Sequence, residues 1–231
     1  MKKQILKRLN KQGFTLVELL VAMGISGVVM AGIYTVYYSQ QKSYAAQEQM
    51  AAMQQNLRAA IYFMEREIRM AGYDPRRDAA ADIQTAGFNT INFTLDITNT
   101  AGTGNPDGLL DGPNEDITYD LDDNDGDGYN DLERNGSLIA ENIDALDFVY
   151  LDGASPPNVL DDDGNGNVVA SIPLIRSIQI TIVARVDRAN PGYTDTNAYF
   201  NQADLEILPA QNDGFRRKRL TTEVKCRNLG L

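Results

Sequence analysis

Hydrophobic residues run almost without a break from Phe14 to Tyr38, and Glu18 is the only charged residue among them. In an α-helix about 25 residues extend roughly 37 Å, which is long enough to cross a bilayer. This length also exceeds the hydrophobic part of an ordinary signal peptide. The pattern therefore predicts a membrane-spanning helical segment over residues 14–38.

Helix-forming residues continue beyond this segment without a proline, and Gly72 followed by Asp74 and Pro75 marks the end of the helix. In the second half, apolar residues recur at intervals of four, three and four positions, which places them on one face. These residues are Leu57, Ile61, Met64 and Ile68. We predict one helix from Phe14 to about Ala71, with residues 39–72 packed on a globular head.

Residues 73–231 change to the alternating pattern of antiparallel strands, separated by loops rich in Gly, Asn and Asp. Alternation is clearest over residues 175–186, where one face is expected to pack on the helix and the other to be mostly polar. The expected strands cover residues 90–96, 116–121, 146–151, 175–186 and 220–227. The predicted fold class is α+β, a long N-terminal helix packed on an antiparallel β-sheet.

Composition excludes several kinds of chemistry. The 231 residues include no His and no Trp, so a His-based catalytic base and a His zinc site are absent. Cys226 is the only cysteine, and its place in an alternating strand predicts a buried thiol rather than a nucleophile. The net charge of -11 disfavours nucleic-acid binding. We predict that the protein is not an enzyme and binds no nucleic acid.

The first 13 residues carry five basic residues and no acid, and they end at Gly13, directly before the apolar segment. Cleavage after Gly13 would remove these charges and keep the helix. An isolated charge inside a membrane costs at least about 2.5 kcal/mol, so Glu18 needs a partner. The new amino group of Phe14 in a neighbouring subunit is one candidate, and a plain anchor with Glu18 at the membrane surface is the alternative.

Residues 13–20, Gly-Phe-Thr-Leu-Val-Glu-Leu-Leu, closely resemble the signal of type IV prepilins and of the pseudopilins of type II secretion. The resemblance implies that residues 1–13 are a leader, which a prepilin peptidase cuts after Gly13. It also implies that Phe14 is methylated and that Glu18 sets the register of subunits during assembly.

The rest of the chain is similar to PilW-like minor pilins, which are related to J-type pseudopilins. The resemblance rests on residues 69–75 (Arg-Met-Ala-Gly-Tyr-Asp-Pro), 117–119, 132–134 and 216–228. It implies a minor subunit that starts, and caps, a type IV pilus together with other minor pilins, the major pilin and an inner-membrane assembly platform. The protein would first span the inner membrane with its head outside the cytoplasm, and would then belong to a cell-surface pilus used for adhesion, motility or DNA uptake.

Oxygen ligands follow the spacing of a calcium loop after the second expected strand. The residues are Asp123, Asp125, Asp127, the carbonyl of Tyr129, and Asp131. Arg134 stands where such loops carry a Glu, so Glu133 or Asp116 would have to complete the shell. A second, less complete match consists of Asp161, Asp163 and Asn165. The alternative for both is an acidic, turn-forming loop without a metal.

Two other functions remain open at this stage. One is a pseudopilin of a type II secretion machine, and the other is a membrane-tethered, calcium-binding adhesin for which Gly13 and Glu18 are dispensable. The basic residues 216–219 could contact an acidic neighbour or the acidic loops of the same head, or remain solvated.

Overall fold

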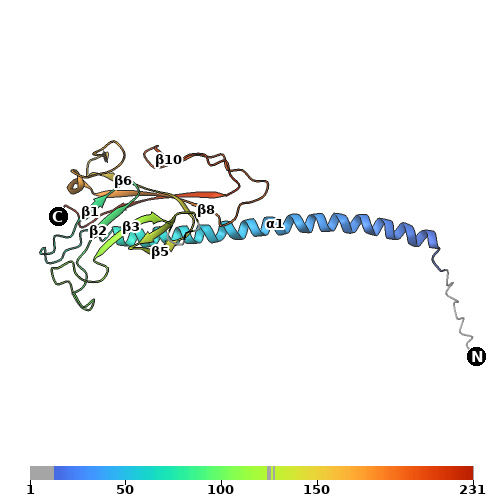
Figure 1. Cartoon of the computed structure of the whole chain (residues 1–231), viewed down its shortest axis with the longest axis horizontal. Coiled ribbons are helices and arrows are strands. Elements are labelled where there is room, and N and C mark those ends of the chain that lie inside the picture. Colours follow the sequence, from blue (N-terminus) through green and yellow to red (C-terminus); the bar gives the residue numbers. More distant parts are fainter. Residues whose placement is uncertain (1–12, 124–125, 127, 231) are drawn as a thin grey trace, which may run out of the picture. The chain divides into compact units, whose positions relative to one another are not determined.

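The computed structural model describes residues 13–123, 126 and 128–230. It divides at Gln47 and Glu48 into an N-terminal helical unit and a second unit that contains the head. Helix α1 (Leu16–Ile68) belongs to both units, and its extent agrees with the predicted helix (Figure 1). All residues from Gly13 to Ala45 are exposed, whereas the last four turns of α1 contribute buried side chains to the head.

The end of α1 is fixed by the change in backbone direction at Gly72, which has φ +74°. The amide of Met70 donates to Glu67 and that of Ala71 to Ile68, so the final turn tightens. The amide of Gly72 then leaves the helix and donates to the carbonyl of Thr94. A Cβ at Gly72 would lie 2.5 Å from Leu229 Cδ2, so glycine is required here for both conformation and space.

The head contains a five-stranded antiparallel sheet in which each strand pairs with its neighbour in the sequence. Short loops join most of these strands, which favours this simple order. The strands are β1 (Ile83–Ala86), β2 (Ile91–Thr94), β3 (Asp116–Asp122), β4 (Asp131–Arg134) and β5 (Ser137–Ala140).

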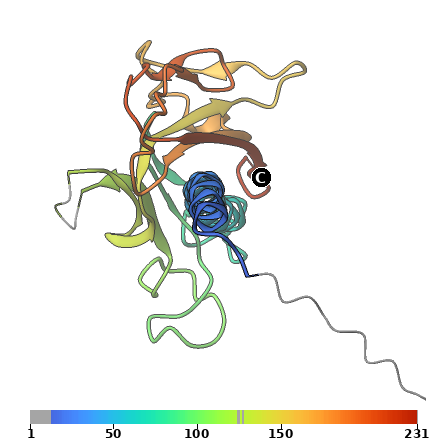
Figure 2. The same ribbon diagram turned by 90° about the vertical axis from the view of Figure 1, so that its right-hand side faces the viewer.

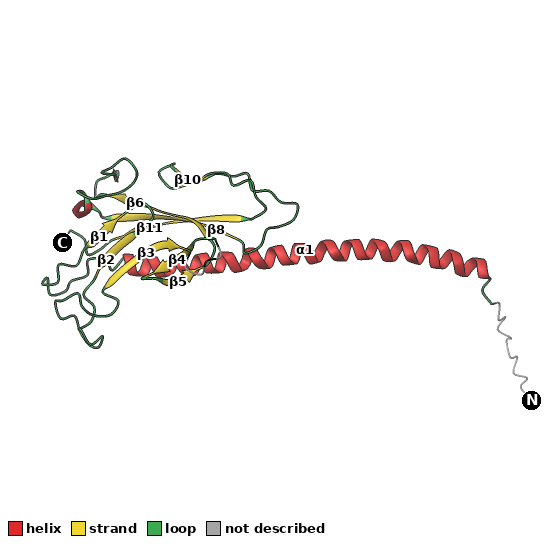
Figure 3. Ribbon diagram, viewed as in Figure 1, coloured by secondary structure: helices red, strands yellow, loops and turns green. Residues whose placement is uncertain are grey.

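A four-stranded antiparallel sheet forms the other layer, in the order β11-β8-β6-β7 (Figure 3). Its strands are β6 (Ile143–Leu151), β7 (Val159–Leu160), β8 (Ser177–Arg185) and β11 (Arg217–Lys225), and a 3-10 turn, η1 (Ile172–Leu174), precedes β8. Between β8 and β11 the chain makes a long excursion, residues 186–216, that includes the hairpin of β9 (Tyr199–Phe200) and β10 (Glu206–Leu208).

The core lies where the C-terminal part of α1 meets both sheets, and Figure 2 shows the sheets on adjoining sides of the helix. All four residues of the predicted apolar face are buried, which confirms that face: Leu57, Ile61, Met64 and Ile68. Glu67 adds a polar contact because its Oε2 accepts bonds from Tyr119 Oη (2.5 Å) and Arg134 Nε (2.8 Å). Burial and the neighbouring carboxylate raise the pKa of Tyr119, so the phenol stays protonated as the donor.

The five expected strands are present as β2, β3, β6, β8 and β11, and the antiparallel α+β fold is confirmed. The second face of β8 carries the expected polar residues, but it is not open to solvent. Thr181, Val183 and Arg185 on that face are all buried. The excursion covers this side of the sheet, and Asn201 within it donates to Asp147 Oδ1 on β6.

Candidate functional site

The start of α1 is closed by reciprocal hydrogen bonds between Thr15 and Glu18. The Thr15 amide donates to Glu18 Oε2 (2.8 Å), as does the Thr15 hydroxyl (2.9 Å), and the Glu18 amide donates to Thr15 Oγ1 (3.2 Å). This is a capping box, which satisfies amides that have no partner inside the helix. The Thr-x-x-Glu spacing is its sequence signal, although only the charge of Glu18 and its expected role in subunit assembly were recognised from the sequence.

Gly13 and Phe14 precede this cap outside the helix, and both are exposed. No atom of the described residues lies within 4 Å of the position that a Cβ on Gly13 would occupy. The predicted cleavage point is therefore accessible, and a side chain at Gly13 would disturb nothing in the described structure.

The exposed part of α1 is long and apolar enough to cross a membrane. Near Tyr38 its surface changes character: the rings of Tyr34 and Tyr38 stack at 6.4 Å, and Lys42 Nζ lies 4.6 Å from the centre of the Tyr38 ring. Tyrosine and lysine are typical of the boundary between hydrocarbon and water. These residues lie where the membrane segment was predicted to end, at residue 38.

Only part of the first acidic loop can be described, because Asn124, Asp125 and Asp127 lie outside the described residues. Asp123 Oδ2 accepts the Gly128 amide (3.1 Å), and Gly128 has φ +88°. Asp123 Oδ1 is buried and has no hydrogen-bond partner among the described residues. A buried carboxylate oxygen without a donor is costly, and a cation would satisfy it.

The strands beside this loop also carry acids in unfavourable positions. Asp120 pairs across the sheet with Glu133, and Asp122 pairs with Asp131; like charges in such positions are destabilising. Burial, followed by the charges of Glu133 and Asp122, raises the pKa of Asp120. Even so, the described residues contain no group of three His, Cys, Asp or Glu side chains arranged to hold a metal.

The strand geometry corrects one expectation for this loop. Asp116 cannot complete a shell around the loop, because it begins β3 while the loop follows the end of that strand. Six residues of strand separate them by roughly 20 Å. Arg134, at the position of the missing Glu, instead binds Glu67 on α1 with an Nε to Oε2 distance of 2.8 Å.

In the second acidic loop, the carboxylates bind the loop's own amides. Asp161 Oδ1 accepts the Gly164 amide (2.7 Å), and Asp163 Oδ1 accepts the Asn165 amide (2.8 Å). Asn167 Nδ2 also donates to Asp163 Oδ2 (2.6 Å). Bonds of this kind form turns without any metal, so the alternative interpretation accounts for the geometry of Asp161, Asp163 and Asn165.

These hydrogen bonds predict that the order of the second acidic loop depends on pH. The Ser171 hydroxyl lowers the pKa of Asp162 to about 2, and the Asn167 side chain does the same for Asp163. Because both folded pKa values lie below the ordinary 3.8, the ordering of the loop should persist above that pH and be lost as the pH falls toward 2. Carboxyl carbon chemical shifts measured by NMR during an acid titration test this.

The variant Ser171→Ala provides the matched control, since it should raise the pKa of Asp162 and leave that of Asp163 near 2. Titration of both wild-type carboxyls close to 3.8 would contradict the described hydrogen bonds.

The basic residues 216–219 have different environments. Arg217 is buried and contacts three acids: its Nε lies 2.5 Å from Asp144 Oδ2, and its Nη1 lies 3.3 Å from Asp195 Oδ2 and 2.7 Å from Asp213 Oδ1. Arg216 stacks over the Tyr193 ring, whereas Lys218 and Arg219 are exposed. Arg217 thus binds acids of the same head, although not those of the two acidic loops.

Arg185 was not recognised from the sequence. Its guanidinium lies 3.4 Å from the centre of the Tyr129 ring and 4.6 Å from that of Phe215, and its Nε is 3.3 Å from Asp144 Oδ1. Tyr129 belongs to the first acidic loop, so this stack attaches the loop to the end of the four-stranded sheet.

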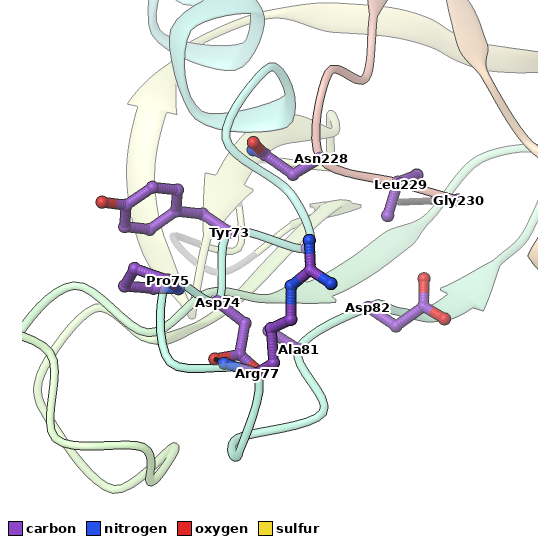
Figure 4. Close-up of a pocket in the computed structure, with 10 residues that line it drawn as sticks. Tyr73, Asp74, Pro75, Arg77, Ala81, Asp82, Asn228, Leu229 and Gly230 are labelled. Atoms are coloured by element: carbon purple, nitrogen blue, oxygen red, sulfur yellow. Dashed lines mark hydrogen bonds between the residues drawn. The ribbon is translucent and has the colours of Figure 1, made fainter.

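A cavity of about 490 Å³ lies where the chain turns after α1 (Figure 4). Asp74 organises its floor by accepting the amides of Arg77, Ala79 and Ala80. Tyr73 and Pro75 lie on one side of the view and Asp82 and Leu229 on the other, with the side chain of Arg77 between them.

Cys226 directly follows β11 and is buried in the core, as predicted. Burial raises the pKa of its thiol to about 12, so the thiolate needed for nucleophilic chemistry is essentially absent near neutral pH.

Comparison with known families and structures gives two findings. Residues 8–34 match the prokaryotic N-terminal methylation motif, so the chain carries the processing signal of type IV prepilins. A type IV-like pilin from Thermus thermophilus is similar in structure, with a TM-score of 0.47 and 15% identity over 76% of this chain and 97% of that one. No curated protein gave a significant match.

Proposed function

We propose that this protein is a PilW-like minor pilin that helps to start, and caps, a type IV pilus. The observation that carries the proposal is the methylation motif over residues 8–34, followed by a capped apolar helix. The protein acts as a structural subunit rather than as an enzyme. Its partners are a prepilin peptidase, an inner-membrane assembly platform, other minor pilins and the major pilin.

In this proposal the leader holds the N-terminus in the cytoplasm through its basic residues, while the head lies outside. Cleavage after Gly13 and methylation of Phe14 release a subunit whose apolar helix leaves the membrane and joins those of other subunits. Burial of the exposed apolar surface of residues 14–38 provides the driving force.

Glu18 can take part in assembly without giving up its role as a cap. Its described hydrogen bonds from Thr15 use Oε2 alone, so within the described residues Oε1 remains available to the amino group of Phe14 in an adjacent subunit. A charged pair of this kind offsets the cost of placing the carboxylate in an apolar environment.

Deletion of the gene, followed by complementation with wild type, tests the function directly. Surface pili are counted, and secreted proteins are assayed, in the same cells. Loss of pili with intact secretion supports a minor pilin, and loss of secretion with normal pili assigns the chain to the type II pseudopilins. Normal pili and normal secretion together with loss of surface attachment would favour the membrane-tethered adhesin.

We further propose that the first acidic loop binds Ca²⁺ through Asp123, Asp125, Asp127, the Tyr129 carbonyl and Asp131. The unpartnered Oδ1 of Asp123 and the opposed acids of β3 and β4 support this. Calcium at 100 times its Kd should stabilise the fold by about 2.7 kcal/mol, which raises Tm by roughly 5 to 10 °C. Thermal unfolding of the full chain with calcium and with EDTA measures this difference.

Asp123→Asn should abolish the calcium-dependent rise in Tm, and Asp161→Asn in the second loop should leave it unchanged. Equal stabilisation of wild type and Asp123→Asn by calcium would rule out the first loop, and loss of the effect only in Asp161→Asn would move the site to the second.

A further inference from the structure

Strand β11 is the edge of the four-stranded sheet, and no strand within the described part of the chain pairs with its outer side. All nine of its residues pair with β8 without a register shift. The other edges of the two large sheets are different: β7 has two residues, while β1 and β5 have four each and an irregular register. Natural proteins usually shorten, kink or cover an edge as long and regular as β11.

The hydrogen bonds at the two ends of β11 show which backbone groups point outward. The Val186 amide donates to the Arg216 carbonyl, and the Cys226 amide donates to the Arg176 carbonyl, both at 2.9 Å. Hydrogen-bonded positions alternate along an antiparallel pair, so the even-numbered residues of β11 face β8. The amides and carbonyls of Arg219, Thr221 and Glu223 therefore face away from the sheet.

This outer edge is basic, although the chain as a whole has a net charge of -11. Lys218, Arg219, Lys225 and the following Arg227 are exposed, and Glu223 is the only acid in β11. Opposite charges on neighbouring strands stabilise their pairing, and like charges destabilise it. Two copies of β11 placed edge to edge would bring two basic strips together, which disfavours pairing between copies of this chain.

We propose that the outer edge of β11 receives an extended, acidic segment of a different filament subunit as an added strand. Backbone hydrogen bonds supply the affinity, and acidic side chains beside Lys218 and Lys225 supply the specificity. The inference rests on the proposed function, because it takes the partner to be a subunit of the same filament.

Thr221 allows a direct test, since its exposed position has an outward-facing amide. Proline is tolerated at an edge position whose amide faces solvent, so Thr221→Pro removes one donor of the outer edge and keeps the bonds to β8. Thr221→Ala is the matched control that retains the amide. Each variant is expressed as the full chain in the deletion strain, and its amount in sheared filaments is measured beside the Tm of the detergent-solubilised protein.

We expect Thr221→Ala to enter filaments as wild type does, and Thr221→Pro to enter them about tenfold less, because a lost hydrogen bond and its unpaired acceptor together weaken binding by this order. The double variant Lys218→Glu with Lys225→Glu should show a similar loss, whereas the two Lys→Gln changes should show a smaller one. If Thr221→Pro lowers the Tm, the comparison of the Lys→Glu and Lys→Gln double variants decides whether a strand is added at this edge.

Equal incorporation of Thr221→Pro and Thr221→Ala, or of the Lys→Glu pair and wild type, would overturn strand addition. A photo-crosslinker at Thr221 that captures β11 of a second copy would also overturn it in favour of self-pairing. If the proposed function is wrong, normal filaments will form without the gene. This result distinguishes failure of the proposed function from failure of strand addition.

Discussion

Replacing Gly13 with Ala is expected to leave the 13-residue leader on the protein and to exclude it from filaments. The methylation motif covers this position, and a peptidase that acts after Gly13 must approach the backbone closely, where a Cβ interferes. In the described structure a Cβ here meets no atom within 4 Å, so the substitution should not alter folding. Intact-mass measurement gives the result: wild type should begin at a methylated Phe14, and the variant should retain residues 1–13.

Gly24→Ala is the matched control, because Gly24 also has no atom within 4 Å of its Cβ position and lies inside α1. This variant should be cleaved and methylated as wild type is. Complementation of the deletion strain by uncleaved Gly13→Ala would contradict the prepilin interpretation and favour a permanently anchored protein.

Replacing Arg217 with Met should lower the free energy of unfolding by about 3 to 5 kcal/mol, because it leaves buried carboxylates without their cation. This is the largest loss of stability expected among the variants described. The Arg217 side chain is 3% exposed, and that of Asp195 is fully buried. Arg217 also connects β11 to β6 through Asp144, and to the excursion through Asp195 and Asp213. Urea unfolding of the full chain measures the change in free energy, with Lys218→Met at the exposed neighbouring position as control.

The pH dependence of stability gives an independent check. Arg217 lowers the pKa of Asp213 below its usual 3.8, so this interaction contributes stability above that pH and loses it as the pH falls. In Arg217→Met, the part of the acid destabilisation that comes from protonation of Asp213 should disappear. If Arg217→Met and Lys218→Met unfold at the same urea concentration, the cluster does not stabilise the head.

The sequence predicted the features that depend on short segments of chain. The helix follows from an apolar segment and a 3.6-residue period, both of which act within a few turns. The strand at Ile178, Ile180 and Ile182 follows in the same way from a period of two. The methylation motif is likewise local, since it lies within residues 8–34.

The prediction failed where a residue's environment is set by distant parts of the chain. Arg185 lies on the face of β8 that was predicted to be mostly polar, but its burial under the excursion after β8, which supplies Phe215, was not predicted. The short strand β4 was not among the expected strands, because four residues carry too little periodicity to be recognised.

The sequence by itself determined the N-terminal methylation motif, the extent of α1, its buried face and the main strands, because each depends on residues close together in the chain. Only the tertiary structure decided which charges are paired. Glu67 meets Arg134 across 67 positions, and Arg217 meets Asp144 across 73. No local pattern encodes such a pair, since it forms only when elements distant in the sequence pack together and exclude the water that would otherwise separate the charges.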